Sequence, residues 1–69
     1  MKLNYYQDTD SLYIDLAPRP SVETREVSEG VSLDYDQTGN LVGIDIDNAS
    51  QKLDLTELIA THIPVPAST

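Results

Sequence analysis

Carboxylate side chains are the groups in this sequence that are best suited to chemistry. The 69-residue chain carries 12 Asp and Glu residues against four Lys and Arg residues, and its formal net charge is −8. Clustered carboxylates ligate hard cations, share protons or attract basic partners. The same charge repels phosphate backbones and anionic lipid surfaces, so we expect neither nucleic-acid binding nor membrane binding.

One run of acidic residues matches part of a calcium-loop template. Asp34, Asp36 and Asp45 fall at positions 1, 3 and 12 of that template, and Gly39 falls at position 6. Position 12 is an Asp, which is shorter than the usual bidentate Glu, and the flanking residues alternate like strands where the motif needs helices. Asp34, Asp36 and Asp45 are therefore the candidate metal ligands, and a divalent-cation-binding module is the alternative function.

Residue types for other site chemistries are scarce. The sequence has no Cys and one His, His62, which excludes thiolate nucleophiles and Cys-ligated zinc. A Ser or Thr nucleophile would need His62 as its base, and nothing in the sequence indicates a residue that orients it. A small hydrolase around His62 is thus the least favoured function, and we assign no catalytic residue and no cofactor. Absence of Cys from so small a domain favours the cytoplasm.

The elements that position the carboxylates are strands, because apolar and polar residues alternate through most of the chain. Period-two alternation predicts half-buried β-strands with one wet face. The apolar positions of the three clearest strands are Leu12, Ile14, Leu16, Val31, Leu33, Tyr35, Val42, Ile44 and Ile46. A shorter strand over 3–5 and a charged one over 22–27, whose inward side is ambiguous, complete the sheet. We expect an α+β fold with a four- to five-stranded antiparallel β-meander.

Two hairpins of one kind are predicted. Residues 1–17 align without a gap on residues 31–47, which pairs Ile14 with Ile44 and Asp15 with Asp45. The connection at 36–40 has a Gly where positive φ is needed, and the connection at 7–11 has Asp in place of Gly. Either duplication or chance similarity between two patterned hairpins accounts for the match.

The alternation also sends aspartates to the polar side of the sheet. If the two hairpins lie side by side, four aspartates gather on the outer face with a tyrosine among them. This candidate interaction surface consists of Tyr13, Asp15, Asp34, Asp45 and Asp47. Such a face is either merely solvated or binds a basic patch on a partner protein. The favoured function is a non-catalytic protein-interaction module.

The C-terminal part changes to a helical period. Asp54 followed by Glu57 three residues later is typical of a capping box. The residues at helical spacing are Leu55, Leu58, Ile59 and His62. We expect one short C-terminal helix packed on the apolar face, a separate helical turn near 48–50, a single domain over 1–63 and a loose tail over 64–69. Because one helix covers such a sheet thinly, we also expect a homo-oligomer.

Two runs of residues together resemble a known family. They are Asp10-Ser11-Leu12-Tyr13-Ile14 and Gly30-Val31-Ser32-Leu33-Asp34-Tyr35-Asp36, the second continuing at Gly39-Asn40-Leu41-Val42-Gly43-Ile44-Asp45-Ile46. The chain resembles, over residues 3–50, a family of small bacterial proteins known only as a domain of unknown function, whose pattern ends in Ala-Ser. Asp45 stands where that family usually has Glu, and Tyr6 where Asp is common. The resemblance implies no activity and no site residues.

Overall fold

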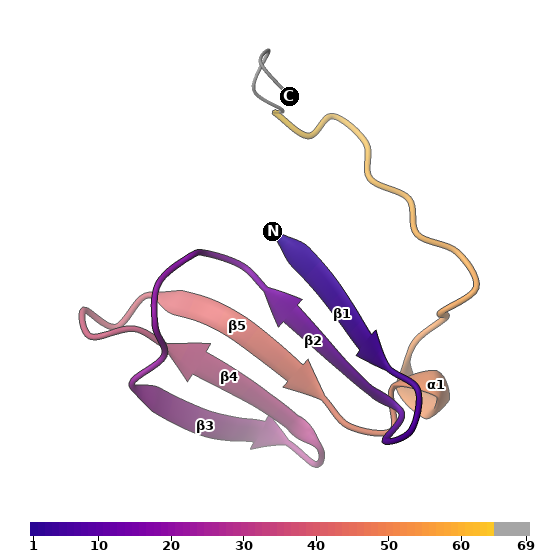
Figure 1. Ribbon diagram of the computed structural model, residues 1–69, viewed down its shortest axis with the longest axis horizontal. Helices are drawn as coiled ribbons and strands as arrows, with labels where there is room; N and C mark the ends of the chain where they lie inside the picture. The colour runs from indigo at the N-terminus through magenta and orange to yellow at the C-terminus, as the bar shows by residue number, and fades with distance from the viewer. Residues whose placement is uncertain (65–69) are drawn as a thin grey trace.

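The computed structural model describes residues 1–64 of the chain. An open five-stranded antiparallel sheet is followed by one short helix and an extended segment (Figure 1). The elements are β1 (Lys2–Tyr6), β2 (Ser11–Asp15), β3 (Glu23–Ser28), β4 (Val31–Tyr35), β5 (Leu41–Ile46) and α1 (Ala49–Lys52). The expected combination of an antiparallel sheet with one short helix after it is confirmed.

The strand order corrects the expected meander. From edge to edge the order is β1-β2-β5-β4-β3, so β5 lies between β2 and β4. The chain crosses from β2 to the far edge, forms β3 there, and returns through β4 to the centre (Figure 1). A meander would place β3 at the centre of the sheet. Its residues are all exposed and include Glu23, Arg25 and Glu26, and such charges suit an edge strand, where they hinder pairing with other sheets.

The register of the central strand pair follows the sequence repeat. Ile14 of β2 lies opposite Ile44 of β5, and these two residues are equivalent under the 30-residue offset. Leu12 lies opposite Ile46, while the Leu16 N–H donates to the Val42 carbonyl at 2.9 Å. The 30-residue offset converts the pair Leu12 and Ile46 into the pair Val42 and Leu16. The two hairpins are therefore related by a local pseudo-two-fold axis at Ile14 and Ile44.

The two sides of the sheet differ in polarity. Directly opposed residues of antiparallel strands share a face, so the registers assign each side chain to one side. The side that we call the apolar face carries Leu3, Tyr5, Leu12, Ile14, Val31, Leu33, Tyr35, Ile44 and Ile46. Its buried centre is small: Leu12 and Ile46 pack with Ala49 of α1, and Ile14, Val31 and Ile44 border this cluster.

The helix lies earlier in the chain than the predicted one. The turn expected near 48–50 is α1, whereas residues 54–62 form no helix. Asp54 caps only a local turn, in which its carboxylate accepts the Thr56 N–H at 3.0 Å. A helix this short is marginal without packing, and Leu58 and Ile59 find none, with 75% and 70% of their surfaces exposed. The tail expected over 64–69 lies, Pro64 apart, outside the described residues.

The turn between β1 and β2 holds the start of α1. Asn48 precedes the helix in a left-handed conformation and makes no side-chain cap. Asp10 supplies the cap instead: its carbonyl accepts the Ala49 N–H at 2.8 Å, and its carboxylate accepts the Ser50 N–H at 3.1 Å and the Ser50 hydroxyl at 2.6 Å. The Tyr5 hydroxyl donates to the same carboxylate at 2.8 Å. Asp10 has φ 53°, as expected for the Asp that replaces Gly in this turn.

Candidate functional site

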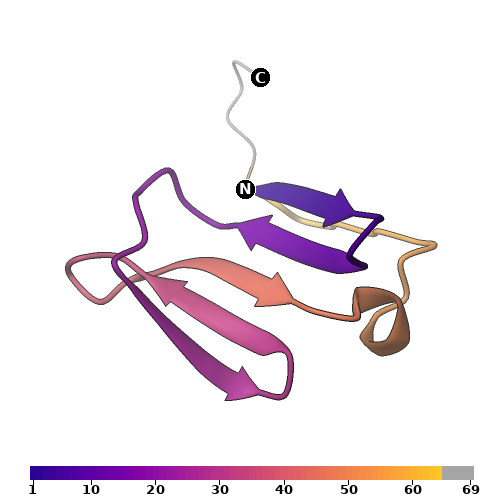
Figure 2. The ribbon, with the colours of Figure 1, turned by 60° about the horizontal axis from the view of Figure 1, so that its bottom comes forward.

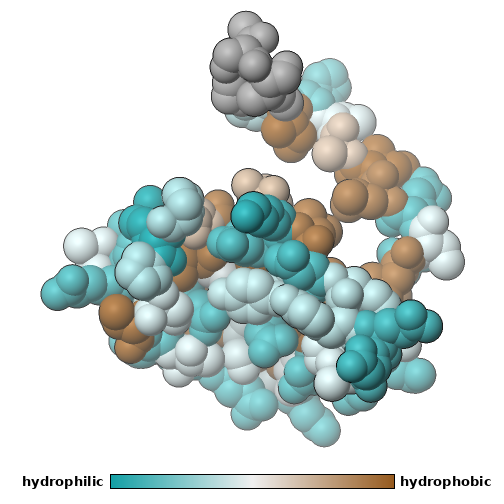
Figure 3. Space-filling model, in the orientation of Figure 1, coloured by the Kyte–Doolittle hydropathy of each residue, from teal (hydrophilic) through white to brown (hydrophobic). Residues whose placement is uncertain are grey.

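The side of the sheet opposite the apolar face carries the predicted carboxylates. Tyr13 lies opposite Asp45, and Asp15 and Asp34 both lie opposite Gly43. Because opposed residues share a face, β2, β5 and β4 together place one tyrosine and three aspartates on one surface. In Figure 3 this surface faces the viewer and is largely hydrophilic.

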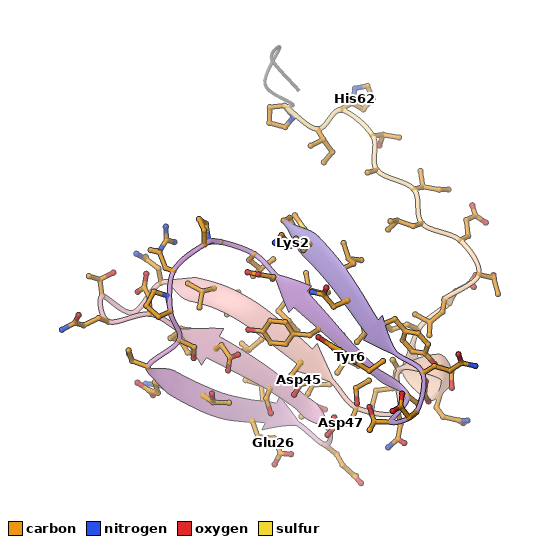
Figure 4. The ribbon with its side chains drawn as sticks, viewed as in Figure 1. Lys2, Tyr6, Glu26, Asp45, Asp47 and His62 are labelled. Carbon is orange, nitrogen blue, oxygen red and sulfur yellow. The ribbon has the colours of Figure 1, made fainter. Side chains whose placement is uncertain are left out.

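Asp47 extends the same group past the end of β5. Figure 4 shows Asp45 and Asp47 following one another along this end of the sheet, with Glu26 of β3 nearby. Asp47 is exposed, whereas Asp15, Asp34 and Asp45 are half-buried. We call this surface, made of Tyr13, Asp15, Asp34, Asp45 and Asp47, the acidic face. The strands bring all these residues to one side, as the alternation predicted.

The Tyr13 ring crosses the sheet above Gly43. A Cβ at position 43 would lie 2.6 Å from Tyr13 Cζ and would overlap the hydroxyl. With no side chain there, the ring passes over β5, and its hydroxyl donates to Asp34 Oδ2 on β4 at 2.7 Å. Gly43 is therefore a close-packing position, as expected for an isolated Gly within a strand.

Asp34 is tied to a third strand as well. Its other carboxylate oxygen, Oδ1, accepts the Thr24 hydroxyl of β3 at 2.6 Å. The contacts from Tyr13 to Asp34 to Thr24 thus link β2, β4 and β3 across the intervening β5. The strand pattern alone did not identify Thr24, because the inward side of its strand was ambiguous. Part of the acidic face is consequently structural: Asp34 orders the sheet, while Asp15 and Asp45 carry none of the side-chain hydrogen bonds found among residues 1–64.

The carboxylates of the acidic face act on one another. Burial raises the pKa of Asp45, and the charges of Asp47 and Asp34 raise it further. The hydrogen bond to Asp34 raises the pKa of Tyr13 to about 12, with smaller contributions from burial and from the charges of the neighbouring aspartates. Both shifts have the sign expected for a surface where negative charge is concentrated. A cation bound to this face would relieve that repulsion.

Asp36 does not join the acidic face, so the three candidate metal ligands are not brought together. Its Oδ1 accepts the N–H groups of Thr38 and Asn40 at 3.0 and 2.9 Å, and its Oδ2 pairs with Arg19 at 2.7 Å. The Asn40 N–H bond, followed by the bonds from Thr38 and Arg19, lowers the pKa of Asp36 to about 2 against the opposing effect of burial. Asp36 therefore closes the β4–β5 turn. Within residues 1–64 no group of three His, Asp or Glu side chains is placed to hold a metal ion.

His62 lies far along the chain from the acidic face. It is exposed in the extended segment after α1, with φ 58°, and Figure 4 shows it well away from Asp45 and Asp47. The helix end at which it was expected does not form. Among the side-chain hydrogen bonds of residues 1–64, none joins His62 to a carboxylate or a hydroxyl group. The position of His62 therefore does not support the hydrolase hypothesis.

These features define a class of protein: a small α+β domain made of one open antiparallel sheet, with an acidic face and an apolar face. The chain belongs to the family described as protein of unknown function (DUF2283), whose model matches residues 2–50. No curated protein and no solved structure matches the chain. No helix within residues 1–64 combines the length and the apolar composition needed to cross a membrane.

The residues that carry the family resemblance make the contacts that build the fold. Asp10 binds Ser50 at the far end of the matched region, and Tyr13 lies against Gly43. The motif therefore describes how the two hairpins and the start of α1 fit together. A functional surface therefore consists of side chains that these structural contacts leave exposed.

Proposed function

We propose that this protein is a non-catalytic interaction module whose acidic face binds a basic patch on a partner protein. The observation that carries the proposal is the concentration of carboxylates that form no side-chain ion pair. The two ion pairs among residues 1–64 join Arg19 to Asp36 and Arg25 to Glu23. Neither involves the acidic face, so the charge of this face is available to a partner.

The face also has the composition of a contact surface. Tyr13 contributes a half-buried ring held by its bond to Asp34, and tyrosine presents a large area at low conformational cost. Asp15 and Asp45 lie on either side of the ring along the central strands. A guanidinium from the partner would contact the ring and a carboxylate together. Arginine-containing basic surfaces therefore fit this face better than isolated lysines.

Lys2 sets one border of the surface. It lies opposite Asp15 on the edge strand β1, whereas Glu26 and Asp47 lie toward the other end of the sheet (Figure 4). Lys52 sets the other border, because its ammonium group donates to the Asp47 carbonyl. The charge of the face is therefore most negative between the two lysines, around Asp45. This is the part that we expect to dominate binding.

The test uses an oligoarginine peptide as the probe and calorimetry as the readout. Asp15→Asn combined with Asp45→Asn removes two charges from the acidic face and leaves Asp34 in place. Asp8→Asn combined with Glu57→Gln removes two charges from exposed positions outside the acidic face and is the matched control. Binding is measured at about 0.01 M and about 1 M ionic strength, where the Debye length is about 30 Å and about 3 Å.

The proposal predicts binding at low ionic strength that the acidic-face variant weakens by about tenfold or more and the control weakens much less. Equal losses in the two variants would show that net charge alone attracts the peptide. That result would remove the acidic face as a specific surface. With a natural basic partner, the same two variants distinguish specific binding to the acidic face from general charge attraction.

A further inference from the structure

A large part of the apolar face is uncovered in a single copy of the chain. α1 packs on Leu12 and Ile46 at one end. Away from that end, Leu3 and Tyr5 are 46% and 45% exposed. Leu33, Tyr35 and Ile44 are only half-buried. In Figure 2 the sheet is a single layer, with the helix at its end.

Residues 53–63, which we call the C-terminal segment, carry a second set of uncovered apolar side chains. Leu58 is 75% exposed, Ile59 70% and Ile63 56%. In Figures 1 and 2 the segment leaves α1 and runs back on the β1 side of the sheet. An apolar groove separates it from the apolar face, lined by Leu3, Leu12, Ile14, Leu53, Leu55 and Leu58 among others.

The apolar face is also the part of the sheet on which two copies of this acidic chain repel each other least. Glu23 and Arg25 are the charged strand residues on that side, and they pair with each other. Arg25 lies over the Tyr35 ring, 5.5 Å from its centroid. The net charge of −8 is therefore carried elsewhere, so two copies that meet through their apolar faces turn their acidic faces outward.

We propose that a second copy of the chain covers the apolar face, and that the C-terminal segment of each copy packs on the apolar face of the other. The two apolar faces then point toward each other, as in a β-sandwich, with the two C-terminal segments between them. Leu58 and Ile59 enter the interface together with Leu33 and Ile44. This dimer does not depend on the function proposed for the acidic face, because that face stays on the outside.

The area of the interface explains why the C-terminal segment takes part. Five strands about 4.8 Å apart and about 17 Å long present roughly 400 Å² on one face. A stable interface buries about 800 Å² per partner, so the sheets alone are too small. The C-terminal segment reaches up to about 36 Å when extended, which exceeds the sheet width of about 24 Å. It supplies the missing area.

A second copy fits better than an unrelated partner because each chain carries both halves of the contact. One half is an apolar sheet face whose two charged residues pair with each other. The other is a segment that carries Asp54 and Glu57 and whose apolar side chains Leu58 and Ile59 its own sheet leaves exposed. A two-fold arrangement matches each half with its complement twice, which is how isologous dimers and exchanged terminal segments form.

Sedimentation equilibrium of the whole chain tests the proposal. Leu58→Ser combined with Ile59→Ser removes two largely exposed apolar side chains from the segment and replaces no buried residue of the sheet. Val22→Ser is the matched control, because Val22 is 63% exposed and lies beside Arg19 and Asp36, away from the segment. We expect a wild-type dimer whose dissociation constant rises about 10,000-fold in the segment variant, because the two-fold dimer loses four side chains at about 1.5 kcal/mol each, and stays unchanged in the control.

Salt separates this dimer from the function of the acidic face. Raising the ionic strength screens the repulsion between the two copies, so the dimer tightens or holds, whereas binding of a basic peptide to the acidic face weakens. Asp15→Asn with Asp45→Asn should leave the dimer intact. Nuclear Overhauser contacts between isotope-labelled Leu58 and unlabelled Leu33 or Ile44 would place the segment on the other copy. A monomer across the micromolar range, an unchanged dimer in the segment variant, or contacts confined to one chain would each overturn the proposal.

Discussion

The Tyr13 hydroxyl reaches Asp34 because the position between them has no side chain. Tyr13 and Gly43 are equivalent under the 30-residue repeat, so one hairpin supplies a ring where the other supplies the space for it. The ring then spans β5 and meets a carboxylate that Thr24 also binds. This contact gives the acidic face its shape, and it makes two predictions at single residues.

Gly43→Ala should lower the free energy of unfolding by about 1–3 kcal/mol, the usual cost of overpacking, because the new methyl group overlaps Tyr13. In a Tyr13→Ala background the same change should be neutral or stabilising by up to about 1 kcal/mol, because Ala is favoured over Gly in a strand once the clash is removed. Urea unfolding of the four proteins measures the coupling. Equal costs in both backgrounds would show that the ring does not occupy this space.

Tyr13→Phe should lower the free energy of unfolding by about 1.5–3 kcal/mol, the typical contribution of a hydrogen bond to a charged group. The folded-state pKa of Tyr13, about 12, is above its unfolded value of about 10. The stability that the bond contributes is therefore fully present below pH ~10 and is lost as the pH rises toward ~12. Ultraviolet titration should show a tyrosinate that ionises near pH 12 in the wild type and is missing in Tyr13→Phe. A difference between the two titration curves that is centred near pH ~10, the ordinary value for tyrosine, would contradict the contact.

Asp36 gives the β4–β5 turn a dependence on pH. Its folded-state pKa of about 2 lies below the unfolded value of about 3.9, so its stabilising effect is present above pH ~4 and lost as the pH falls toward ~2. Asp45 acts in the opposite direction, because its raised pKa means that protonation favours the folded state. Urea midpoints between pH 5 and pH 2 should fall more steeply in the wild type than in Asp36→Asn. Identical slopes would mean that the turn does not hold this carboxylate.

The cap on α1 is shared between two distant elements. Ser50→Ala should lower the urea midpoint because the helix loses its hydroxyl bond to Asp10, and Asp10→Ala should lower it further because it also removes the bond to Tyr5. The double variant should resemble Asp10→Ala alone, since the two residues act through one network. Asp8→Ala, in the same turn, is the control and should change little. Additive losses from Asp10 and Ser50 would argue against the shared cap.

The strands were predictable from the sequence and the C-terminal helix was not, for one physical reason. Alternation such as Leu12, Ile14 and Leu16 fixes a face wherever a sheet is available to bury it. Helical spacing at Leu55, Leu58 and Ile59 leads to a stable helix only if the apolar side of that helix packs on another surface. In one copy of the chain these residues stay exposed. The Asp10 cap joins residues forty positions apart, and a local sequence pattern does not predict a contact over that separation.

The acidic face was likewise predictable in its membership, though its internal contacts were not. Alternation assigned Tyr13, Asp15, Asp34 and Asp45 to one side. Asp34 forms hydrogen bonds that order the sheet, whereas the side chains of Asp15 and Asp45 form none within residues 1–64. This difference depends on the strand order, which puts β5 between β2 and β4. A meander would have separated these residues by the charged β3.

At the scale of the whole molecule, the sheet separates two kinds of surface that respond to salt in opposite ways. The acidic face gathers charge from three strands, and the apolar face keeps its few charges paired. Charge-driven binding weakens with ionic strength, whereas apolar association between like-charged copies does not. The two proposals therefore use opposite sides of one small domain: a second copy covers the apolar face, and a basic partner binds the acidic face.

Residue-resolved nuclear magnetic resonance during titration with an oligoarginine peptide tests the acidic face most directly. At low ionic strength we predict amide shifts concentrated at Tyr13, Asp15 and Asp45 and extending to Asp47, and these should vanish at high ionic strength. Shifts centred instead on Asp8 or Glu57, or spread evenly over every exposed carboxylate, would contradict a specific acidic face.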